Sequence, residues 1–307
     1  MIAPPSSARF REALVELRDA LRREESRGGN GLKRVGGVVE VELPKNAPVA
    51  VVGDTHGDYV TFKRILRKAE ESGVISKGLL IALGDYVDRG APEEQVLLVY
   101  ELAELKKEMR ERLILLRGNH EPPPGLIPYP HDYPWVLKEL YGYEEGEGLY
   151  SISREVFDSM PHALIVKNVA LLVHGGLPTR FGALSALEYL AHDRRVDVLE
   201  EILWNDPSEH VEWRAPSPRG AGYLWGRRVT DEALRLLGVK FVVRGHEPVY
   251  DGFKVSHGGR VLTVFSRLGP PYYNGRAAFL ECLGELFAEK PLDCLRLLEY
   301  DYGELSS

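Results

Sequence analysis

The amino-acid sequence predicts an α/β fold on two observations. Six short apolar runs lack the polar–apolar alternation of a half-exposed strand, which is typical of strands buried on both faces. Segments with helical spacing of apolar residues separate several of the runs, and strands that alternate with helices indicate an α/β fold. The runs lie at residues 49–52, 79–83, 113–116, 169–173, 241–243 and 261–265.

The chain opens with a segment that has the periodicity of an amphipathic helix. Phe10, Leu14, Leu17 and Leu21 recur at intervals that place them on one helical face. We expect this helix to pack on the core, and a partner-binding helix is the alternative interpretation. Residues 1–47 are therefore assigned to an N-terminal helix and a lead-in strand.

Further helices are expected between the strands. One is indicated over residues 60–69, and another begins at Pro92, because proline is favoured in the first turn. Thr230 is expected to cap a helix over residues 231–237, which Gly238 ends.

Length and composition suit one large domain or two small ones, and we assign one domain to residues 1–307. Its motif-bearing core spans residues 48–280, and C-terminal strands and a tail span 281–307. The net charge of −7 argues against general nucleic-acid binding, although a locally positive site can still bind an anion. Neither a signal peptide nor an apolar run of roughly 18 residues occurs, so no membrane partner is expected.

The cysteine and glutamine counts indicate the environment of the protein. Cys282 and Cys294 are the two cysteines, which does not predict a disulfide scaffold and fits a cytoplasmic location. Gln95 is the single glutamine, whereas glutamate and arginine are abundant. This composition is typical of a thermophile.

Metal-competent side chains follow five of the six runs: Asp54, His56, Asp85, Asn119, His174 and His246. In open α/β sheets, ligands bind outside the carboxyl ends of the strands. Oxygen and imidazole donors without a thiolate suit Mn, Fe or Zn. Six ligands exceed what one tetrahedral zinc needs and suffice for two metals if one carboxylate bridges. Such a pair activates water and clamps a phosphoryl group.

Groups that could bind and protonate a phosphate ester lie close by in the sequence. Arg89 and Arg219 carry the planar guanidinium group that fits phosphate oxygens. His120 follows the expected ligand Asn119 and is a candidate general acid, with Asp88 fixing its tautomer.

The motifs that carry these residues resemble the signature series of the PPP family of serine/threonine protein phosphatases, within the calcineurin-like metallophosphoesterase superfamily. They occur in the family's order as GDTHGD (53–58), GDYVDRG (84–90), RGNHE (117–121), HGG (174–176), LWNDP (203–207) and RGH (244–246). The resemblance implies a four-layer sandwich of two β-sheets flanked by helices. It also implies a dinuclear centre at the strand ends.

The resemblance assigns roles to individual residues. The first metal would take Asp54 and His56, Asp85 would bridge, and the second metal would take Asn119, His174 and His246. Phosphate contacts would come from Arg89, Asn119, His120 and Arg219, with His120 and Asp88 as the acid pair. Asp206 and Arg244 would support the site, and Tyr272 and Tyr273 compete as the tyrosine that overhangs it. Mn²⁺ is the cation expected to support activity in vitro, with Fe and Zn as alternatives.

The sequence departs from the family pattern at three places. Asn205 stands in LWNDP where the family usually has serine, and the loop at 266–273 is unusual. Six prolines fall within residues 122–134, where the family usually runs into a helix. Because proline fixes φ and removes backbone donors, 122–134 is predicted to form a stiff, non-helical rim that shapes the mouth of the site.

The sequence therefore predicts a metal-dependent phosphatase of phosphoserine and phosphothreonine proteins that releases inorganic phosphate by direct attack of activated water. One alternative is a dinucleoside polyphosphate hydrolase or another small-phosphate esterase on the same scaffold. A second alternative is a phosphate-binding scaffold without turnover. Five histidines, His131 among them, are interpreted as structural or surface residues. Regulatory subunits are not predicted.

Overall fold

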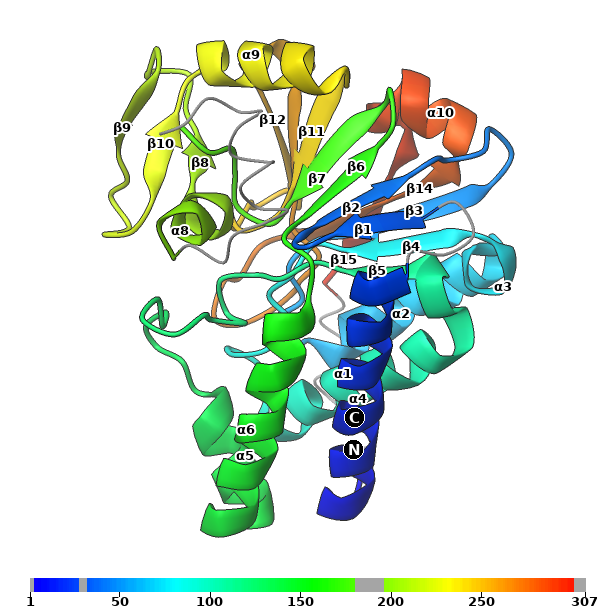
Figure 1. Cartoon of the computed structure of the whole chain (residues 1–307), viewed down its shortest axis with the longest axis vertical. Helices are drawn as coiled ribbons and strands as arrows, with labels where there is room; N and C mark the ends of the chain where they lie inside the picture. Colours follow the sequence, from blue (N-terminus) through cyan, green and yellow to red (C-terminus); the bar gives the residue numbers. More distant parts are fainter. Residues whose placement is uncertain (1–2, 28–31, 180–195, 301–307) are drawn as a thin grey trace.

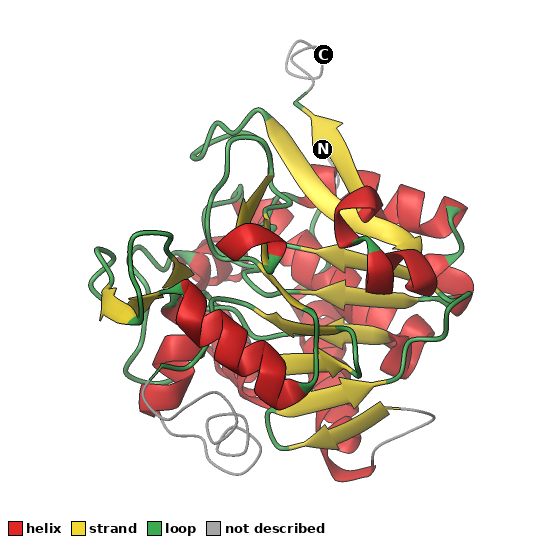
Figure 2. Cartoon of the chain, turned by 90° about the horizontal axis from the view of Figure 1, so that it is seen from above, coloured by secondary structure: helices red, strands yellow, loops and turns green. Residues whose placement is uncertain are grey.

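The computed structural model describes residues 3–27, 32–179 and 196–300. Two β-sheets pack face to face, and helices cover the outer face of each (Figures 1 and 2). The predicted four-layer sandwich is therefore confirmed, although the predicted C-terminal tail at 301–307 lies outside the described residues. Within the described ranges, none of the helices combines the length and apolarity needed to cross a membrane.

The larger sheet has the strand order β1-β2-β6-β7-β11-β13-β12. Its strands are β1 (Leu32–Val35), β2 (Val38–Val41), β6 (Ala163–Val166), β7 (Ala170–Val173), β11 (Phe241–Arg244), β12 (Phe253–Ser256) and β13 (Val261–Val264). The central strands β7, β11 and β13 are parallel, so their carboxyl ends lie at one edge.

The second sheet has the order β15-β14-β3-β4-β5, in which β3, β4 and β5 are parallel. Its strands are β3 (Pro48–Val52), β4 (Leu79–Ala82), β5 (Leu113–Leu115), β14 (Arg276–Leu283) and β15 (Leu295–Glu299). A small third sheet joins β8 (Asp206–Pro207), β9 (Arg214–Pro216) and β10 (Tyr223–Trp225).

Helices lie on the two outer faces of the sandwich. Figure 1 shows α8 and α9 beside the larger sheet, and α1, α2, α4, α5 and α6 on the opposite side of the molecule. The helices are α1 (Ser7–Arg27), α2 (Tyr59–Glu71), α3 (Val74–Lys77), α4 (Pro92–Met109), α5 (Tyr133–Tyr141), α6 (Tyr143–Ser159), α8 (Val196–Trp204), α9 (Arg227–Leu237) and α10 (Gly284–Glu289). Short 3₁₀ turns follow at η1 (Arg110–Arg112), η2 (His257–Gly259) and η3 (Pro291–Cys294).

The continuous apolar runs are strands because both of their faces are buried. In β3, Val49 and Val51 belong to the core between the two sheets, whereas Ala50 and Val52 pack in the core under the helices. All six predicted runs form strands, namely β3, β4, β5, β7, β11 and β13. The apolar face of α1 is buried as predicted, with Phe10 and Leu14 fully covered.

Local details differ from the predictions at two places. The lead-in region forms an antiparallel hairpin of β1 and β2 rather than one strand. Thr230 does not cap a helix, because α9 already begins at Arg227. Its buried hydroxyl accepts from Trp225 Nε1 (2.9 Å) and contacts His257 Nδ1 (2.8 Å), and this tertiary role explains why the cap prediction was wrong.

The proline-rich rim is non-helical over residues 122–132, as predicted, but its end was misplaced. The helix α5 begins at Tyr133, and Pro134 occupies its first turn, where a missing N–H costs no hydrogen bond. The predicted boundary at 134 is therefore two residues too late.

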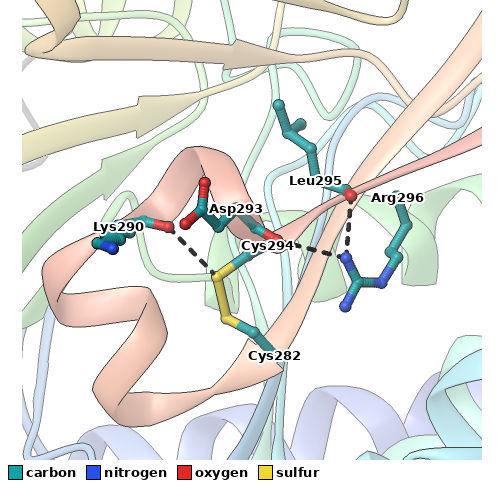
Figure 3. Close-up of a disulfide and its surroundings, with 6 residues drawn as sticks. All are labelled: Cys282, Lys290, Asp293, Cys294, Leu295 and Arg296. Atoms are coloured by element: carbon teal, nitrogen blue, oxygen red, sulfur yellow. Dashed lines mark hydrogen bonds between the residues drawn. A yellow bond between two sulfur atoms is a disulfide. The ribbon is translucent and has the colours of Figure 1, made fainter.

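The structure joins Cys282 in β14 to Cys294 in η3 by a disulfide, which the sequence did not predict (Figure 3). The two cysteines are 12 residues apart, and the bridge ties η3 and the following edge strand β15 to β14. A disulfide stabilises a fold mainly by restricting the unfolded chain.

Opening this bridge should lower stability without changing the site. We expect the double variant Cys282→Ser/Cys294→Ser to lose about 2–3 kcal/mol of unfolding free energy, since a loop of this length limits the unfolded chain by roughly that amount. Urea unfolding with and without reductant measures the loss. The variant itself should be insensitive to reductant, and equal stability of variant and wild type would show that the bridge contributes nothing.

Candidate metal centre and active site

The carboxyl ends of parallel strands from both sheets converge on one buried cluster of polar side chains. An isolated bridge between Asp54, after β3, and Phe265, after β13, joins the two sheets at this edge. Each side chain that the sequence assigns as a metal ligand is at most 5% exposed: Asp54, His56, Asp85, Asn119, His174 and His246.

Two of the histidines have a tautomer that the backbone dictates. His56 Nδ1 lies 3.0 Å from the carbonyl oxygen of Val87, and His174 Nδ1 lies 3.0 Å from that of Leu83. A carbonyl oxygen can only accept, so Nδ1 donates in both residues and the Nε2 lone pairs face the cluster. Burial, followed by neighbouring positive groups, lowers the pKa of both imidazoles well below their ordinary value, so both rings are neutral.

The Nε2 lone pairs therefore point at oxygens that are themselves acceptors. His174 Nε2 is 2.9 Å from Asn119 Oδ1 and 3.3 Å from Asp85 Oδ1. His56 Nε2 is 3.3 Å from Asp85 Oδ2. Two acceptors at this distance repel each other unless a cation lies between them. His246 Nδ1 reaches the same amide oxygen of Asn119 at 2.8 Å.

The donor atoms fit two cations that share Asp85. Histidine and carboxylate atoms gather in two overlapping groups, His56–Asp85–His120 and Asp85–His174–His246. Asp54 Oδ2 and His246 Nε2 are buried at this centre without a hydrogen-bond partner. Buried polar atoms are nearly always satisfied, so the unpaired carboxylate oxygen of Asp54 is an available ligand.

The charges of the carboxylates also require cations. Burial raises the pKa of Asp54 to about 7, although the N–H of His246 opposes the shift. Burial and then the neighbouring charges of Asp54 and Glu121 raise the pKa of Asp85 well above its ordinary value. Without cations, the folded protein holds these acids protonated, whereas bound cations would stabilise the ionised forms.

Glu121 is a structural member of the site that the residue-by-residue assignment missed. Its fully buried carboxylate accepts from the backbone N–H groups of Asp85 (2.8 Å), Tyr86 (2.8 Å) and Gly118 (2.9 Å). These bonds fix the turn that presents Asp85. A side chain at Gly118 would overlap the Asp85 carboxylate, so this position needs glycine. The RGNHE motif contains this glutamate, and that motif is the signal that could have identified it.

Several site residues adopt backbone angles that glycine tolerates best. Left-handed φ values between 42° and 71° occur at His56, Asp85, Asp88, Arg89 and His246. Each such residue costs about 1–3 kcal/mol, which the surrounding hydrogen bonds must offset. For example, the carbonyl oxygen of Asp85 accepts from the N–H groups of Thr55 (3.1 Å) and His56 (2.8 Å).

The expected acid pair is assembled beside the metal ligands. His120 Nδ1 lies 2.5 Å from Asp88 Oδ2, and the N–H of His120 donates to Asp85 Oδ1 at 2.9 Å. Burial alone would raise the Asp88 pKa, but hydrogen bonds from His120 and His131 outweigh it and hold that pKa below its ordinary value. Burial lowers the pKa of His120, and Asp88 opposes this shift. His131, interpreted as a structural or surface residue, contacts Asp88 through its Nδ1 at 2.7 Å.

A cavity of about 270 Å³ opens above these groups. Its wall includes Arg89, Arg219 and Tyr272, together with Pro128 and Tyr129 from the rim. A larger cavity of about 720 Å³ lies beside it and also contacts Arg89, but none of the expected metal ligands lines it. The smaller cavity is therefore the one in which phosphate chemistry can take place.

Asp206 links Arg219, an expected phosphate contact, to Arg244, which was expected to support the site. Arg219 Nε donates to Asp206 Oδ2 (2.6 Å), and Arg244 Nη2 donates to Asp206 Oδ1 (2.9 Å). Arg244 is fully buried, and its Nε donates to the carbonyl of Gly175 (2.6 Å), so it braces the site. Asn205 replaces the usual serine with a buried cross-link, donating to Leu177 O (2.7 Å).

The structure separates the two competing tyrosines. The Tyr272 ring lies 5.5 Å from that of His56 and lines the cavity, whereas Tyr273 is 73% exposed and does not. Of the two predicted substrate contacts, Tyr272 is therefore the one that the geometry supports. Burial raises the pKa of Tyr272 to about 12, so its hydroxyl stays protonated. Arg267, which the sequence analysis did not single out, donates to the carbonyl oxygens of His56 and Arg89 and so holds this loop.

The sequence of this chain is similar to those of known phosphoesterases and protein phosphatases. A family model described as calcineurin-like phosphoesterase matches residues 47–250. The catalytic subunit of serine/threonine-protein phosphatase 4 from Kluyveromyces lactis is 34% identical over 76% of this chain and 73% of that protein. The same subunit from Saccharomyces cerevisiae is 32% identical over 80% of this chain and 76% of that protein. This chain spans 58% of the length of a Caenorhabditis elegans relative with 32% identity.

A solved structure has the same fold. It is a protein serine/threonine phosphatase from Saccharomyces cerevisiae with similarity to human phosphatase PP5. The TM-score is 0.75 at 23% identity, and the match covers 97% of this chain and 90% of that chain.

Without metal, the buried carboxyl of Asp54 should make the fold less stable as the pH rises. Burial raises the pKa values of Asp54 and Glu121 to about 7, so the folded, metal-free protein keeps carboxyl protons that the unfolded chain has lost. The buried neutral histidines act in the opposite direction, so the effect of Asp54 is the difference in unfolding free energy between wild type and Asp54→Asn, which should decrease from about pH 4 to about pH 7. Cations need ionised ligands, so stabilisation by Mn²⁺ should grow over the same range. Thermal unfolding in EDTA and in Mn²⁺ across pH 5–8 measures both.

The variant Asp54→Asn is the control for this prediction. In EDTA it should lack the loss of stability with rising pH that Asp54 contributes, and it should respond less to Mn²⁺, because one buried acid is lost. Identical unfolding curves in EDTA and Mn²⁺ at every pH would contradict a metal centre.

Proposed function

Because the chain belongs to the calcineurin-like phosphoesterases and, within them, to the PPP family of serine/threonine protein phosphatases, we propose that it hydrolyses phosphoserine and phosphothreonine in proteins. One observation carries the proposal. Asp85 belongs to two groups of metal-competent side chains, in which histidine nitrogens face its carboxylate oxygens. A cavity lined by arginines and by the acid His120 opens beside these groups. When bound, two divalent cations supply nucleophilic water at neutral pH and positive charge for the phosphoryl oxygens.

The side chains proposed to hold the cations also determine the net charge of the centre. Asp54 and His56 would hold the first cation, Asp85 would be shared, and the second cation would take His174, His246 and the neutral amide oxygen of Asn119. A neutral ligand in place of a third carboxylate leaves the centre more positive, which favours a phosphate dianion.

The remaining side chains bind the phosphate and protonate the leaving group. Arg89 and Arg219 bind phosphoryl oxygens, and their planar donors orient the ester for attack by water from the opposite side. Asp88 accepts from Nδ1 of His120, so Nε2 faces the cavity and delivers a proton to the departing serine or threonine oxygen. The Tyr272 hydroxyl, protonated at neutral pH, is a further hydrogen-bond donor in the cavity wall. The phosphoryl group passes to water without a covalent phosphoenzyme.

The proposal extends to the setting of the enzyme. Mn²⁺ supports activity in vitro, and Fe or Zn fit the same donors. Residues 1–307 act as one catalytic domain. A cytoplasmic location in a thermophile is compatible with the disulfide, since intracellular proteins of hyperthermophiles often contain such bridges. Phosphorylated proteins are the partners, and inorganic phosphate is a product.

Phosphate release from a phosphoserine peptide with added Mn²⁺ tests the proposal. Asp54→Asn and His246→Ala should each lower kcat/KM at least about 100-fold, because each removes a cation ligand on which the activated water depends. Parallel assays with phosphothreonine and phosphotyrosine peptides and diadenosine tetraphosphate identify the preferred substrate.

The outcomes separate the candidate functions. Faster turnover of diadenosine tetraphosphate than of any phosphopeptide would favour the small-phosphate esterase. Tight phosphopeptide binding without turnover under any divalent metal would favour a binding scaffold. Activity that both variants retain would rule out the assigned centre.

The proline rim should influence substrate choice. Pro128 and Tyr129 line the cavity, so replacing Pro122–Pro124 with alanines should loosen this wall. We expect the ratio of kcat/KM values for two phosphopeptides of different sequence to change by about three- to tenfold, while 4-nitrophenyl phosphate turnover changes less than about twofold. Unchanged ratios would mean that the rim merely connects β5 to α5.

A further inference from the structure

Asp88 receives more hydrogen bonds than one acid partner requires. The backbone N–H groups of Asp132 (2.9 Å) and Tyr133 (2.8 Å) donate to its Oδ1. Its Oδ2 contacts two imidazoles, His120 Nδ1 at 2.5 Å and His131 Nδ1 at 2.7 Å. The start of α5 therefore holds one carboxylate oxygen, and the two histidines share the other.

His131 is itself anchored on its far side. Its Nε2 lies 2.9 Å from the hydroxyl of Tyr150 in α6, and the side chain is 6% exposed. An ionised carboxylate only accepts, so Nδ1 of His131 donates to Asp88, and in the neutral ring Nε2 accepts from the Tyr150 hydroxyl. Every polar atom of the ring then has a partner, which is a built arrangement and not an incidental surface contact.

Asp88, His120 and His131 could also be interpreted as a third cation site, and the available donors argue against it. Asp88 Oδ2 lies 2.5 and 2.7 Å from the Nδ1 atoms of two imidazoles, and each can donate a proton to it. At the metal centre, by contrast, His56 and His174 already donate Nδ1–H to backbone carbonyls, so their Nε2 lone pairs face acceptors. Asp88 is satisfied by donors and has no unpaired oxygen, so it needs no cation.

We propose that His131 is a positioning residue for the general acid, holding Asp88 Oδ2 in place so that the Nε2 of His120 faces the leaving oxygen. The inference rests on the proposed phosphatase function. Without the donor from His131, the shared oxygen of Asp88 can tilt away, and His120 loses the fixed partner that orients its ring. The connection runs from His120 through Asp88 and His131 to Tyr150, so the rim segment that contains His131 also serves the chemistry.

Comparing substrates with different leaving groups separates a misplaced general acid from general structural damage. A serine alkoxide is strongly basic and needs a proton as it departs, whereas 4-nitrophenolate is weakly basic and departs without one. Misplacing His120 should therefore slow phosphoserine hydrolysis and spare 4-nitrophenyl phosphate. Damage to the metal centre would slow both substrates.

The test compares His131→Ala, His131→Asn and Tyr150→Phe with wild type on both substrates. We expect His131→Ala to lower kcat on a phosphoserine peptide about tenfold, a part of the roughly 100- to 10,000-fold that general acid catalysis contributes. KM values and 4-nitrophenyl phosphate turnover should change less than about twofold. Asparagine can present a side-chain N–H near the position of Nδ1, so His131→Asn should restore most of the loss, and Tyr150→Phe should have a smaller effect. The exposed His210→Ala is the matched control and should behave as wild type.

Two results would overturn the proposal: equal losses on both substrates in a folded His131 variant, or no loss on the phosphoserine peptide. A wild type that turns over neither substrate would instead refute the proposed function. In that case, proton NMR of ¹⁵N-histidine-labelled protein still decides. The Nδ1–H proton of His120, assigned with a His120→Asn variant, should shift or broaden in His131→Ala and return toward its wild-type position in His131→Asn. An unchanged resonance in His131→Ala would contradict positioning by His131.

Discussion

The site depends on a repulsion between acceptor atoms that bound cations relieve. Backbone carbonyls force His56 and His174 to direct their Nε2 lone pairs inward, where carboxylate and amide oxygens already face them. Without a cation, the buried carboxyl of Asp85 must keep a proton to relieve its part of this contact. The folded state tolerates it because two sheets meet at this edge and Glu121 locks the Asp85 turn. Cation binding and the geometry of the strand ends are therefore one requirement.

The sequence predicted the parts of this centre that single positions determine. Buried strands are continuous apolar runs, and the ligands follow those strands directly, so both could be located without coordinates. The misses are positions whose role depends on tertiary contacts rather than on the local sequence pattern. Thr230 was predicted to cap a helix, but its hydroxyl contacts Trp225 and His257. Neither the Cys282–Cys294 bridge nor the contact of His131 with Asp88 has a local signal in the sequence.

The proline-rich segment shows how a departure from a family pattern can be accommodated. Prolines keep residues 122–132 out of a helix, and the chain then returns to Asp88 through His131 and the first N–H groups of α5. Gln95 closes this arrangement, since it accepts from the N–H of Asp88 (3.0 Å) and donates to Asp132 Oδ2 (3.3 Å). The rim of the cavity and His131, the second partner of Asp88, are consequently parts of one connected segment.

The same coupling extends to the metal centre through one strand end. Asn119 and His120 are adjacent after β5, and the N–H of His120 donates to the Oδ1 of Asp85, the carboxylate that both cations would share. A displacement of either cation would therefore affect His120 through Asp85 Oδ1. A displacement of Asp88 would likewise affect Asp85 through His120. Asn119 and His120 are adjacent, and His120 is bonded to the proposed shared ligand. This arrangement would keep the activated water and the proton donor at a fixed relative position, which separate loops would not. That fixed position is what an in-line displacement requires, because attack and departure occur on opposite sides of one phosphorus.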